Sequence, residues 1–222
     1  MAVYDGRVPP RPKHPTFSTV LLVRHGTTPS TGKILPGRAP NLHLSEVGVA
    51  QAKTAAERIS ELKTAPTQIY ASPLERTRET AQPIARALGI RTRVNKGLLE
   101  CDFGTWTGER LDRLMKKKEW AQVQRSPSTF RFPSGESFSE MATRTYDTVV
   151  DLASRHRGET IVLVSHADPI KAVISTAIGS PLDLFQRITI SPCSVSALLF
   201  SDAGPHVLAV NTTGSLKELA LS

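Results

Sequence analysis

The chain has 222 residues and a formal net charge of +8, which is long enough for one sizeable α/β domain and too short for two complete ones. No stretch approaches the ~20 uninterrupted apolar residues of a membrane-spanning helix, and no basic segment followed by an apolar run opens the chain. We therefore expect a soluble, cytoplasmic protein without a membrane partner. A positive net charge is compatible with binding a nucleic acid, a membrane surface or an anionic small molecule. No zinc-ligand cluster, recognition helix or aromatic-rich motif accompanies the charge, which disfavours a nucleic-acid partner.

The chain opens with a proline-rich stretch. Residues 1–16 contain Pro9, Pro10, Pro12 and Pro15 among scattered charges, a composition that does not form a packed element. We expect a tail or a strap lying on the domain. Residues 17–222 are expected to form the folded domain.

Five strands are predicted from apolar runs. Residues 19–23 and 160–164 are continuously apolar or β-branched, as in parallel strands that helices cover on both faces, and residues 68–71 form a shorter run of the same kind. Residues 194–200 and 207–210 predict two further strands, joined as a hairpin at residues 202–205.

Amphipathic spacing and capping signals predict helices between these strands, over residues 45–62, 72–89, 115–120 and 137–158. Ser72-Pro73 followed by Glu75 predicts a helix start with a capping box, and Ser137 with Glu140 repeats that pattern. Lys116 to Lys118 are interpreted as the solvated face of a helix. Strands that alternate with helices indicate a three-layer α/β/α sandwich with an open, mostly parallel sheet.

Reactive side chains gather where the predicted strands end. Arg24 and His25 close the first strand, Arg76 lies in the first turn of the helix after the second, and His166 closes the third. Ligands bind outside the carboxyl ends of strands in open α/β sheets, and the helix starts expected at Thr28-Pro29, Ser72-Pro73 and Asp168-Pro169 would add a positive potential. Because guanidinium groups match phosphate oxygens, this set predicts a phosphoryl clamp.

Each of these residues alone has a plainer interpretation. A histidine at the end of a strand is more often a hydrogen-bonded core residue than a catalyst, and Asp168 is best explained as a helix N-cap. The joint presence of two histidines and two arginines at one sheet edge favours the phosphoryl clamp. The sequence also repeats itself there, since Val-Leu-Leu-Val-Arg ends at His25 and Ile-Val-Leu-Val-Ser ends at His166.

At this point the sequence resembles the histidine phosphatase superfamily, first through Leu-Val-Arg24-His25-Gly26-Thr27-Thr28. The further matches, in the family's order, are Gly37 with Leu44-Ser45 and Gly48, Ala71-Ser72-Pro73-Leu74 with Arg76 and Thr80-Ala81, Leu99-Glu100 with Gly104 and Gly108, Gly135-Glu136-Ser137, and Val164-Ser165-His166. Within the family the sequence looks most like bacterial probable phosphomutases and broad-specificity phosphatases.

The resemblance implies a phosphoglycerate mutase-like fold and a role for each catalytic residue. His25 would be the nucleophile that forms a phosphohistidine, and Glu100 the proton donor. Arg24, Arg76 and His166 would bind the phosphate. No metal and no cofactor are expected, because cationic side chains already surround the phosphoryl oxygens. The expected partner is a phosphorylated small molecule.

Four further residues are expected to contact the substrate: Thr28, Thr31, Arg38 and Ala167. Thr31 stands where the family often has asparagine, and Ala167 where it commonly has glycine. Thr31 keeps a hydroxyl and Ala167 keeps a backbone N–H, so contacts with phosphate can be retained. Residues 109–134 are expected to contribute to specificity as well.

Three functions are compatible with these residues. A phosphatase is favoured because the stretch from Glu100 to His166 is shorter than in the mutases that the sequence resembles, which place a longer insertion there to enclose the reaction. A phosphomutase is the first alternative. The second is a non-catalytic module that binds a phosphorylated ligand, which the full set of expected catalytic side chains disfavours.

Overall fold

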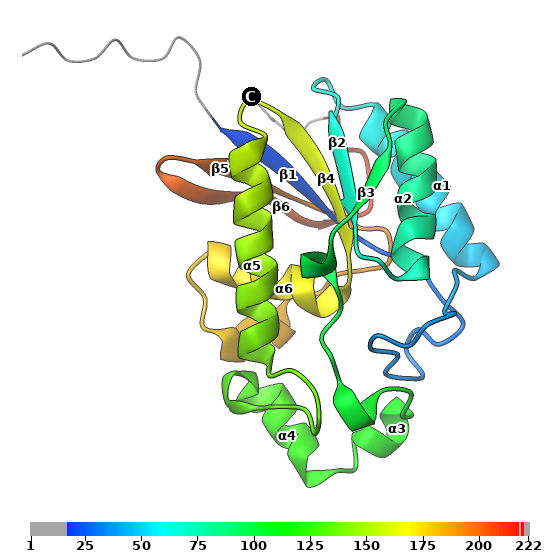
Figure 1. Ribbon diagram of the computed structural model, residues 1–222, viewed down its shortest axis with the longest axis vertical. Helices are drawn as coiled ribbons and strands as arrows, with labels where there is room; N and C mark the ends of the chain where they lie inside the picture. The colour runs from blue at the N-terminus through cyan, green and yellow to red at the C-terminus, as the bar shows by residue number, and fades with distance from the viewer. Residues whose placement is uncertain (1–16, 218, 220–222) are drawn as a thin grey trace, which may run out of the picture.

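The computed structural model describes residues 17–217 and 219, and in it a six-stranded sheet lies between two layers of helices (Figure 1). The strands are β1 (Ser18–Arg24), β2 (Gln68–Ala71), β3 (Thr92–Val94), β4 (Thr160–Ser165), β5 (Val195–Ser201) and β6 (Gly204–Thr212). Their order is β3-β2-β4-β1-β5-β6. The first four are parallel, and β5 and β6 pair antiparallel, which confirms an open, mostly parallel sheet.

The α-helices of the described residues are α1 (Glu46–Ser60), α2 (Glu75–Leu88), α3 (Leu111–Leu114), α4 (Lys118–Arg125), α5 (Phe138–Arg155) and α6 (Ala167–Ala177). Short 3-10 helices are η1 (Lys96–Leu98), η2 (Gly104–Trp106), η3 (Pro127–Thr129) and η4 (Leu182–Arg187). Within the described ranges, no helix is long and apolar enough to cross a membrane. The proline-rich stretch 1–16 lies outside the described residues.

The two faces of β1 explain why its sequence is apolar throughout. Leu21 and Val23 pack in one core cluster with side chains of α1 and α2, whereas Val20 and Leu22 pack in another with side chains of α5 and α6. Successive side chains of a strand point to opposite faces, so a strand covered on both sides is apolar at every position. The predicted three-layer arrangement is confirmed.

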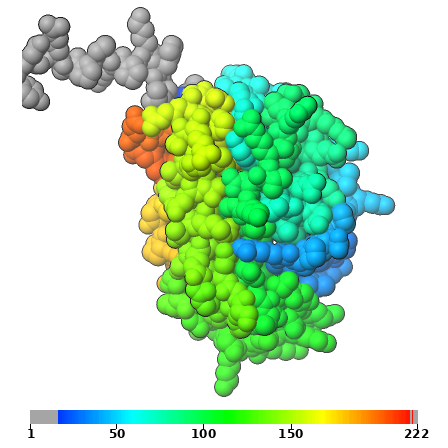
Figure 2. All heavy atoms as spheres, in the orientation of Figure 1, coloured from blue at the N-terminus to red at the C-terminus, as the bar shows by residue number. Residues whose placement is uncertain are grey.

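The side of the sheet where the parallel strands end is covered by residues 109–134, here called the cap segment, which contain α3, α4 and η3 (Figure 1). An aromatic cluster that includes Phe103, Trp106 and Phe132 joins this segment to the domain. The stretch after β1, in blue in Figure 2, lies across the green residues that follow α2. Leu35 fixes this contact, because its N–H donates to Glu109 O (2.9 Å) and its carbonyl accepts from Gly108 N (2.8 Å).

Several predicted helix boundaries are confirmed. The capping box at Ser137 and Glu140 is formed, and Gly89 ends α2 in the left-handed conformation. Strand β3 was not predicted, because its short sequence Thr-Arg-Val is mostly exposed and shows no apolar run.

Two predicted capping residues have other partners, so those predictions are wrong. Helix α2 begins at Glu75 after Leu74, and the Ser72 hydroxyl lies 2.9 Å from a ring nitrogen of His166. Helix α6 begins at Ala167 with His166 as its N-cap residue, and Asp168 pairs instead with Lys171. In both places a tertiary contact takes the side chain that local sequence assigned to a cap.

Two further predictions of helix are wrong. No helix follows Thr28-Pro29, because the Thr31 hydroxyl accepts from Thr28 N (2.9 Å) and closes a turn. The run Lys116 to Lys118 is not one helical face, since α3 ends at Leu114 and α4 begins only at Lys118.

Candidate active site

The two strand-end histidines lie side by side because β1 and β4 are neighbours. Arg24 is in register with Ser165 in the parallel pair, so the next residues, His25 and His166, meet at the sheet edge. Their ring centroids are 5.2 Å apart, and both side chains are buried. The repeated sequence that ends at each histidine is therefore a pair of adjacent strands that deliver two imidazoles to one place.

His25 is held as a neutral imidazole with one free nitrogen. Its Nδ1 lies 2.7 Å from the carbonyl oxygen of Gly26, and a carbonyl only accepts, so Nδ1 carries the proton and Nε2 has the lone pair. Burial lowers the pKa of His25 to about 3, and the charges of Arg76 and Arg24 act in the same direction. A neutral imidazole with an available Nε2 is the form that a nucleophile requires.

Arg24 and Arg76 carry buried donors without partners. Arg24 Nη1 donates to Ile190 O (2.6 Å) and Arg76 Nη2 donates to Gly37 O (2.7 Å), which orients both guanidinium groups. Nε of Arg24 and Nε and Nη1 of Arg76 are buried and find no hydrogen-bond partner among the described residues. Since buried unpaired donors are unfavourable, these nitrogens are available to donate hydrogen bonds to an oxyanion.

His166 presents a third buried donor or acceptor to the same place. Its Nε2 lies 2.9 Å from the Ser72 hydroxyl, and its Nδ1 is buried without a partner in the part of the chain that the structure describes. Burial lowers the pKa of His166 well below its usual value, with further contributions from Arg76 and His25. The imidazole is therefore neutral, and the Ser72 hydroxyl influences which nitrogen holds the proton.

The pKa of Glu100 is raised, whereas those of the two histidines are lowered. Its pKa is raised to about 7: burial is the largest cause, the charge of Asp168 acts in the same direction, and the Cys101 N–H and the two arginines oppose the rise. One carboxylate oxygen accepts from Cys101 N (2.9 Å), which fixes the side chain. His25 is thus a base with a lowered pKa, and Glu100 is an acid with a raised pKa. General acid catalysis beside a nucleophile requires this combination.

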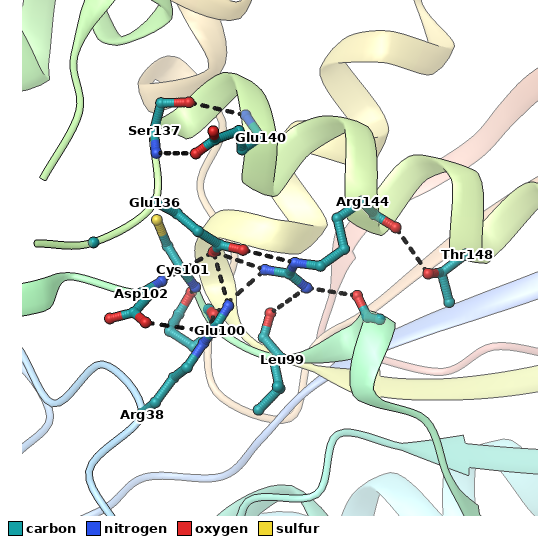
Figure 3. Close-up of polar contacts among 12 residues, drawn as sticks. Arg38, Leu99, Glu100, Cys101, Asp102, Glu136, Ser137, Glu140, Arg144 and Thr148 are labelled. Atoms are coloured by element: carbon teal, nitrogen blue, oxygen red, sulfur yellow. Dashed lines mark hydrogen bonds and ion pairs between the residues drawn. The ribbon is translucent and has the colours of Figure 1, made fainter.

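Glu136 holds two arginines beside Glu100 (Figure 3). Arg144 donates from Nε and Nη2 to the two carboxylate oxygens of Glu136 (2.9 and 3.0 Å), and Arg38 Nη2 reaches the same carboxylate at 2.8 Å. Asp102 N also donates to Glu136 (3.0 Å). The carboxylate thus joins the start of α5 to the stretch that carries Glu100.

The same two arginines bind the backbone around Glu100. Arg38 Nε donates to the carbonyl oxygen of Glu100 (2.8 Å), and Arg144 Nη1 donates to those of Gly97 (2.7 Å) and Leu99 (3.1 Å). This backbone forms η1 and an extended stretch, which has few regular hydrogen bonds of its own. Arginine side chains therefore supply the hydrogen bonds that fix the peptide preceding the carboxyl group.

The four residues that were expected to contact substrate lie around this centre. The Thr28 and Thr31 hydroxyls contact each other (3.0 Å) within the turn that follows His25. Ala167 opens α6, where the first N–H groups have no partner within the helix. Arg38 has its nitrogens on Glu100, Glu136 and Asp102 rather than on an open surface.

The loop that carries His25 is packed directly on the start of α1. A Cβ on Gly26 would lie 2.6 Å from Gly48 O, and a Cβ on Gly48 would lie 2.1 Å from Thr27 O. Gly26 N also donates to the Thr80 hydroxyl of α2 (3.0 Å). Two glycines are needed because two backbones touch at this point.

Sequence reasoning missed three contributors to this site. The Ser72 hydroxyl was assigned to a cap, Glu136 was seen only as part of a motif, and Arg144 lies on the polar side of a predicted helix without any local signal. Among the described residues, no group of three or more His, Cys, Asp or Glu side chains is arranged to hold a metal ion.

The chain belongs to the histidine phosphatase superfamily (branch 1), whose family model matches residues 20–213. It is 30% identical over 177 residues to phosphoserine phosphatase 1 of Hydrogenobacter thermophilus, covering 79% of this chain and 83% of that protein. It is 32% identical over 180 residues to the probable phosphoglycerate mutase GpmB of Erwinia tasmaniensis, covering 80% and 82%. A bifunctional protein of Mycobacterium tuberculosis is 31% identical over 208 residues, but that match covers 90% of this chain and only 56% of the relative's length.

Solved structures share the fold. A mutant phosphoserine phosphatase of Entamoeba histolytica, in complex with phosphoserine, superposes with a TM-score of 0.80 at 26% identity, covering 90% of this chain and 99% of that chain. The α-ribazole phosphatase of Shigella flexneri gives a TM-score of 0.78 at 21% identity, covering 90% and 99%. The sheet and its helices therefore form a phosphoglycerate mutase-like fold.

Proposed function

We propose that the protein is a phosphomonoester hydrolase that works through a phosphohistidine on His25. The observation that carries the proposal is the presence of a neutral, buried His25 and a Glu100 of raised pKa together with guanidinium donors that have no partner among the described residues. A nucleophile, an acid and an anion clamp are the three parts that phosphoryl transfer to an enzyme side chain requires.

In the first step, Nε2 of His25 attacks phosphorus and the bond from phosphorus to the ester oxygen breaks. The Glu100 carboxyl transfers its proton to that oxygen, so the leaving group departs as an alcohol. Arg24 and Arg76 donate to the phosphoryl oxygens, as does Nδ1–H of His166 when Ser72 donates its hydroxyl proton to Nε2. These contacts stabilise the charge in the transition state.

In the second step, water attacks phosphorus and gives a proton to the Glu100 carboxylate. The bond to His25 breaks and inorganic phosphate leaves, which restores the starting state. Arg38 and Arg144 support this exchange by holding the backbone on both sides of Glu100 in place. We propose Thr28, Thr31 and Ala167 as part of the wall around the phosphate.

The experiment that tests the proposal is trapping of the intermediate. Brief reaction with a ³²P-labelled phosphoester should leave label on the protein that is stable in alkali and lost in acid, as expected of a phosphoramidate, and His25→Ala should carry none. Label that survives acid would indicate a serine or threonine ester and contradict the proposal. Release of inorganic phosphate, compared with isomerisation of 3-phosphoglycerate, separates a phosphatase from a phosphomutase.

A further inference from the structure

A crevice of about 270 Å³ lies between the cap segment and the start of α6. Leu35, Phe103, Leu111, Trp120 and Val123 form much of its wall, and all five side chains are apolar or aromatic. Phe103 and Val123 belong to the buried aromatic cluster, and the other three are partly buried against it. The wall is thus an apolar surface that packs against the buried aromatic cluster.

The two charged side chains of the crevice, Lys171 and Asp168, pair with each other. Lys171 Nζ lies 3.2 Å from an Asp168 carboxylate oxygen and 2.9 Å from Gln186 Oε1, and all three residues line the crevice. The side chains of Lys171 and Asp168 are only 16% and 18% exposed, so the ion pair is largely shielded from water. Binding a carboxylate there would require Lys171 to give up its partner, which favours an uncharged occupant.

The crevice adjoins the active site through Phe103. A Cβ on Gly37 would lie 3.1 Å from the Phe103 ring, and the Gly37 carbonyl accepts from Arg76 Nη2 (2.7 Å). Phe103 follows Glu100 by three positions in the chain, and Asp168 follows His166 by two. The carboxylate of Asp168 is close enough to Glu100 to raise the pKa of the Glu100 carboxyl group. A leaving group that accepts a proton from Glu100 departs on this side.

We propose that the crevice binds the alcohol portion of the substrate, and that this alcohol is uncharged and apolar, either an alkyl chain of several carbons or a single aromatic ring. A volume of 270 Å³ accommodates a fragment of that size rather than a large ligand. The inference rests on the proposed phosphatase activity and adds its substrate class. It distinguishes this chain from an enzyme whose preferred leaving group is a charged amino acid or hydroxy acid.

The test is a series of straight-chain alkyl phosphates, from ethyl to hexyl, measured with phosphoserine and 3-phosphoglycerate as charged comparators. Each methylene that enters the crevice should raise kcat/KM by about 4-fold, which follows from the transfer free energy of one buried methylene group. Hexyl phosphate should be a better substrate than either charged ester by at least about 10-fold.

Two variants that fill the crevice make the test specific. Val123→Phe and Leu111→Phe each add volume at the wall, and either should reduce the gain per methylene to nearly 1-fold. Val150→Phe is the matched control, because Val150 is an exposed residue of α5 outside the crevice, and it should keep the full slope.

The experiment tests the proposed substrate class and the proposed phosphatase activity separately. A wild-type kcat/KM that does not change with chain length, or a preference for phosphoserine, would overturn the crevice proposal while leaving the phosphatase intact. Failure of every ester to label His25 or release phosphate would instead refute the proposed function. The wild-type series decides the question even where a filling variant fails to fold.

Discussion

Arg144 donates to both carboxylate oxygens of Glu136 and, through its third nitrogen, to the backbone just before Glu100. We expect Arg144→Met to slow phosphohistidine formation from an alkyl phosphate by about 10-fold, a part of what a general acid contributes. Formation from p-nitrophenyl phosphate, whose leaving group scarcely needs a proton, should change little. A loss of the same size for both esters would mean that Arg144 supports the fold and not the proton donor.

The matched control for this variant lies on the same helix. Arg155 is also in α5 and pairs with Asp151, but its side chain is exposed. Arg155→Met should leave both single-turnover rates unchanged.

Glu100→Gln tests the proton donor directly. Because the amide cannot donate a proton to the departing oxygen, phosphorylation of His25 by an alkyl phosphate should slow by about 100-fold or more, with a much smaller loss for p-nitrophenyl phosphate. Single-turnover measurements isolate this step from the later water attack. Equal losses for the two esters would assign Glu100 to phosphate positioning and make His166 the next candidate donor.

The pH dependence follows from the two shifted pKa values. Glu100 must be protonated to act as an acid, so kcat/KM for an alkyl phosphate should fall as the pH rises through about 7. His25 must be neutral, and its pKa of about 3 keeps it so throughout the working range. Since the substrate also titrates near pH 6, the measurement is the wild-type profile divided by that of Glu100→Gln. A ratio that is flat across pH 7 would contradict the assignment.

Removal of metal ions should not affect turnover. On the proposed mechanism Arg24 and Arg76 balance the phosphoryl charge and neutral His166 adds a hydrogen bond, so exhaustive treatment with a chelator should leave the rate within experimental error of the untreated enzyme. Rates are compared before treatment, after treatment, and after addition of Mg²⁺, Mn²⁺ or Zn²⁺. Loss of activity that one of these ions restores would require a different mechanism.

Inorganic phosphate should stabilise the folded protein. The buried nitrogens of Arg24 and Arg76 that lack partners among the described residues gain hydrogen bonds when an oxyanion binds. At phosphate concentrations about 100 times the dissociation constant, the free energy of unfolding should rise by about 2.7 kcal/mol. Thermal unfolding with and without phosphate at matched ionic strength measures this. Arg76→Met should lose most of the increase, and an undiminished increase in that variant would place phosphate elsewhere.

The sequence predicted the parts of the fold that depend on local pattern. The apolar runs of β1 and β4 indicated buried parallel strands, because strands that helices cover on both faces are apolar throughout. That these two strands are neighbours is seen only in the folded chain. The capping box at Ser137 was also readable, since its partner is three residues away.

What the sequence did not predict depends on partners far along the chain. The Ser72 hydroxyl contacts His166, 94 positions away, and this contact replaced the local cap that was expected. Arg144 binds the carbonyl of Leu99, 45 positions away, and no periodicity or spacing in the sequence indicates such a contact. The contribution of Asp168 to the raised pKa of Glu100 is likewise visible only in the folded chain.

The close contact between Gly26 and Gly48 restricts which substitutions the nucleophile loop can accept. Any side chain at either position would push backbone against backbone, so the nucleophile loop and α1 can change only together. The cap segment is held in a similar way at its end, where a Cβ on Gly104 would lie 2.0 Å from Pro133 O, but Met115 within the segment is 59% exposed. If the proposed function holds, substitutions of such exposed residues should alter which alcohol is accepted while the geometry at His25 stays the same, so new specificities can arise without an inactive intermediate.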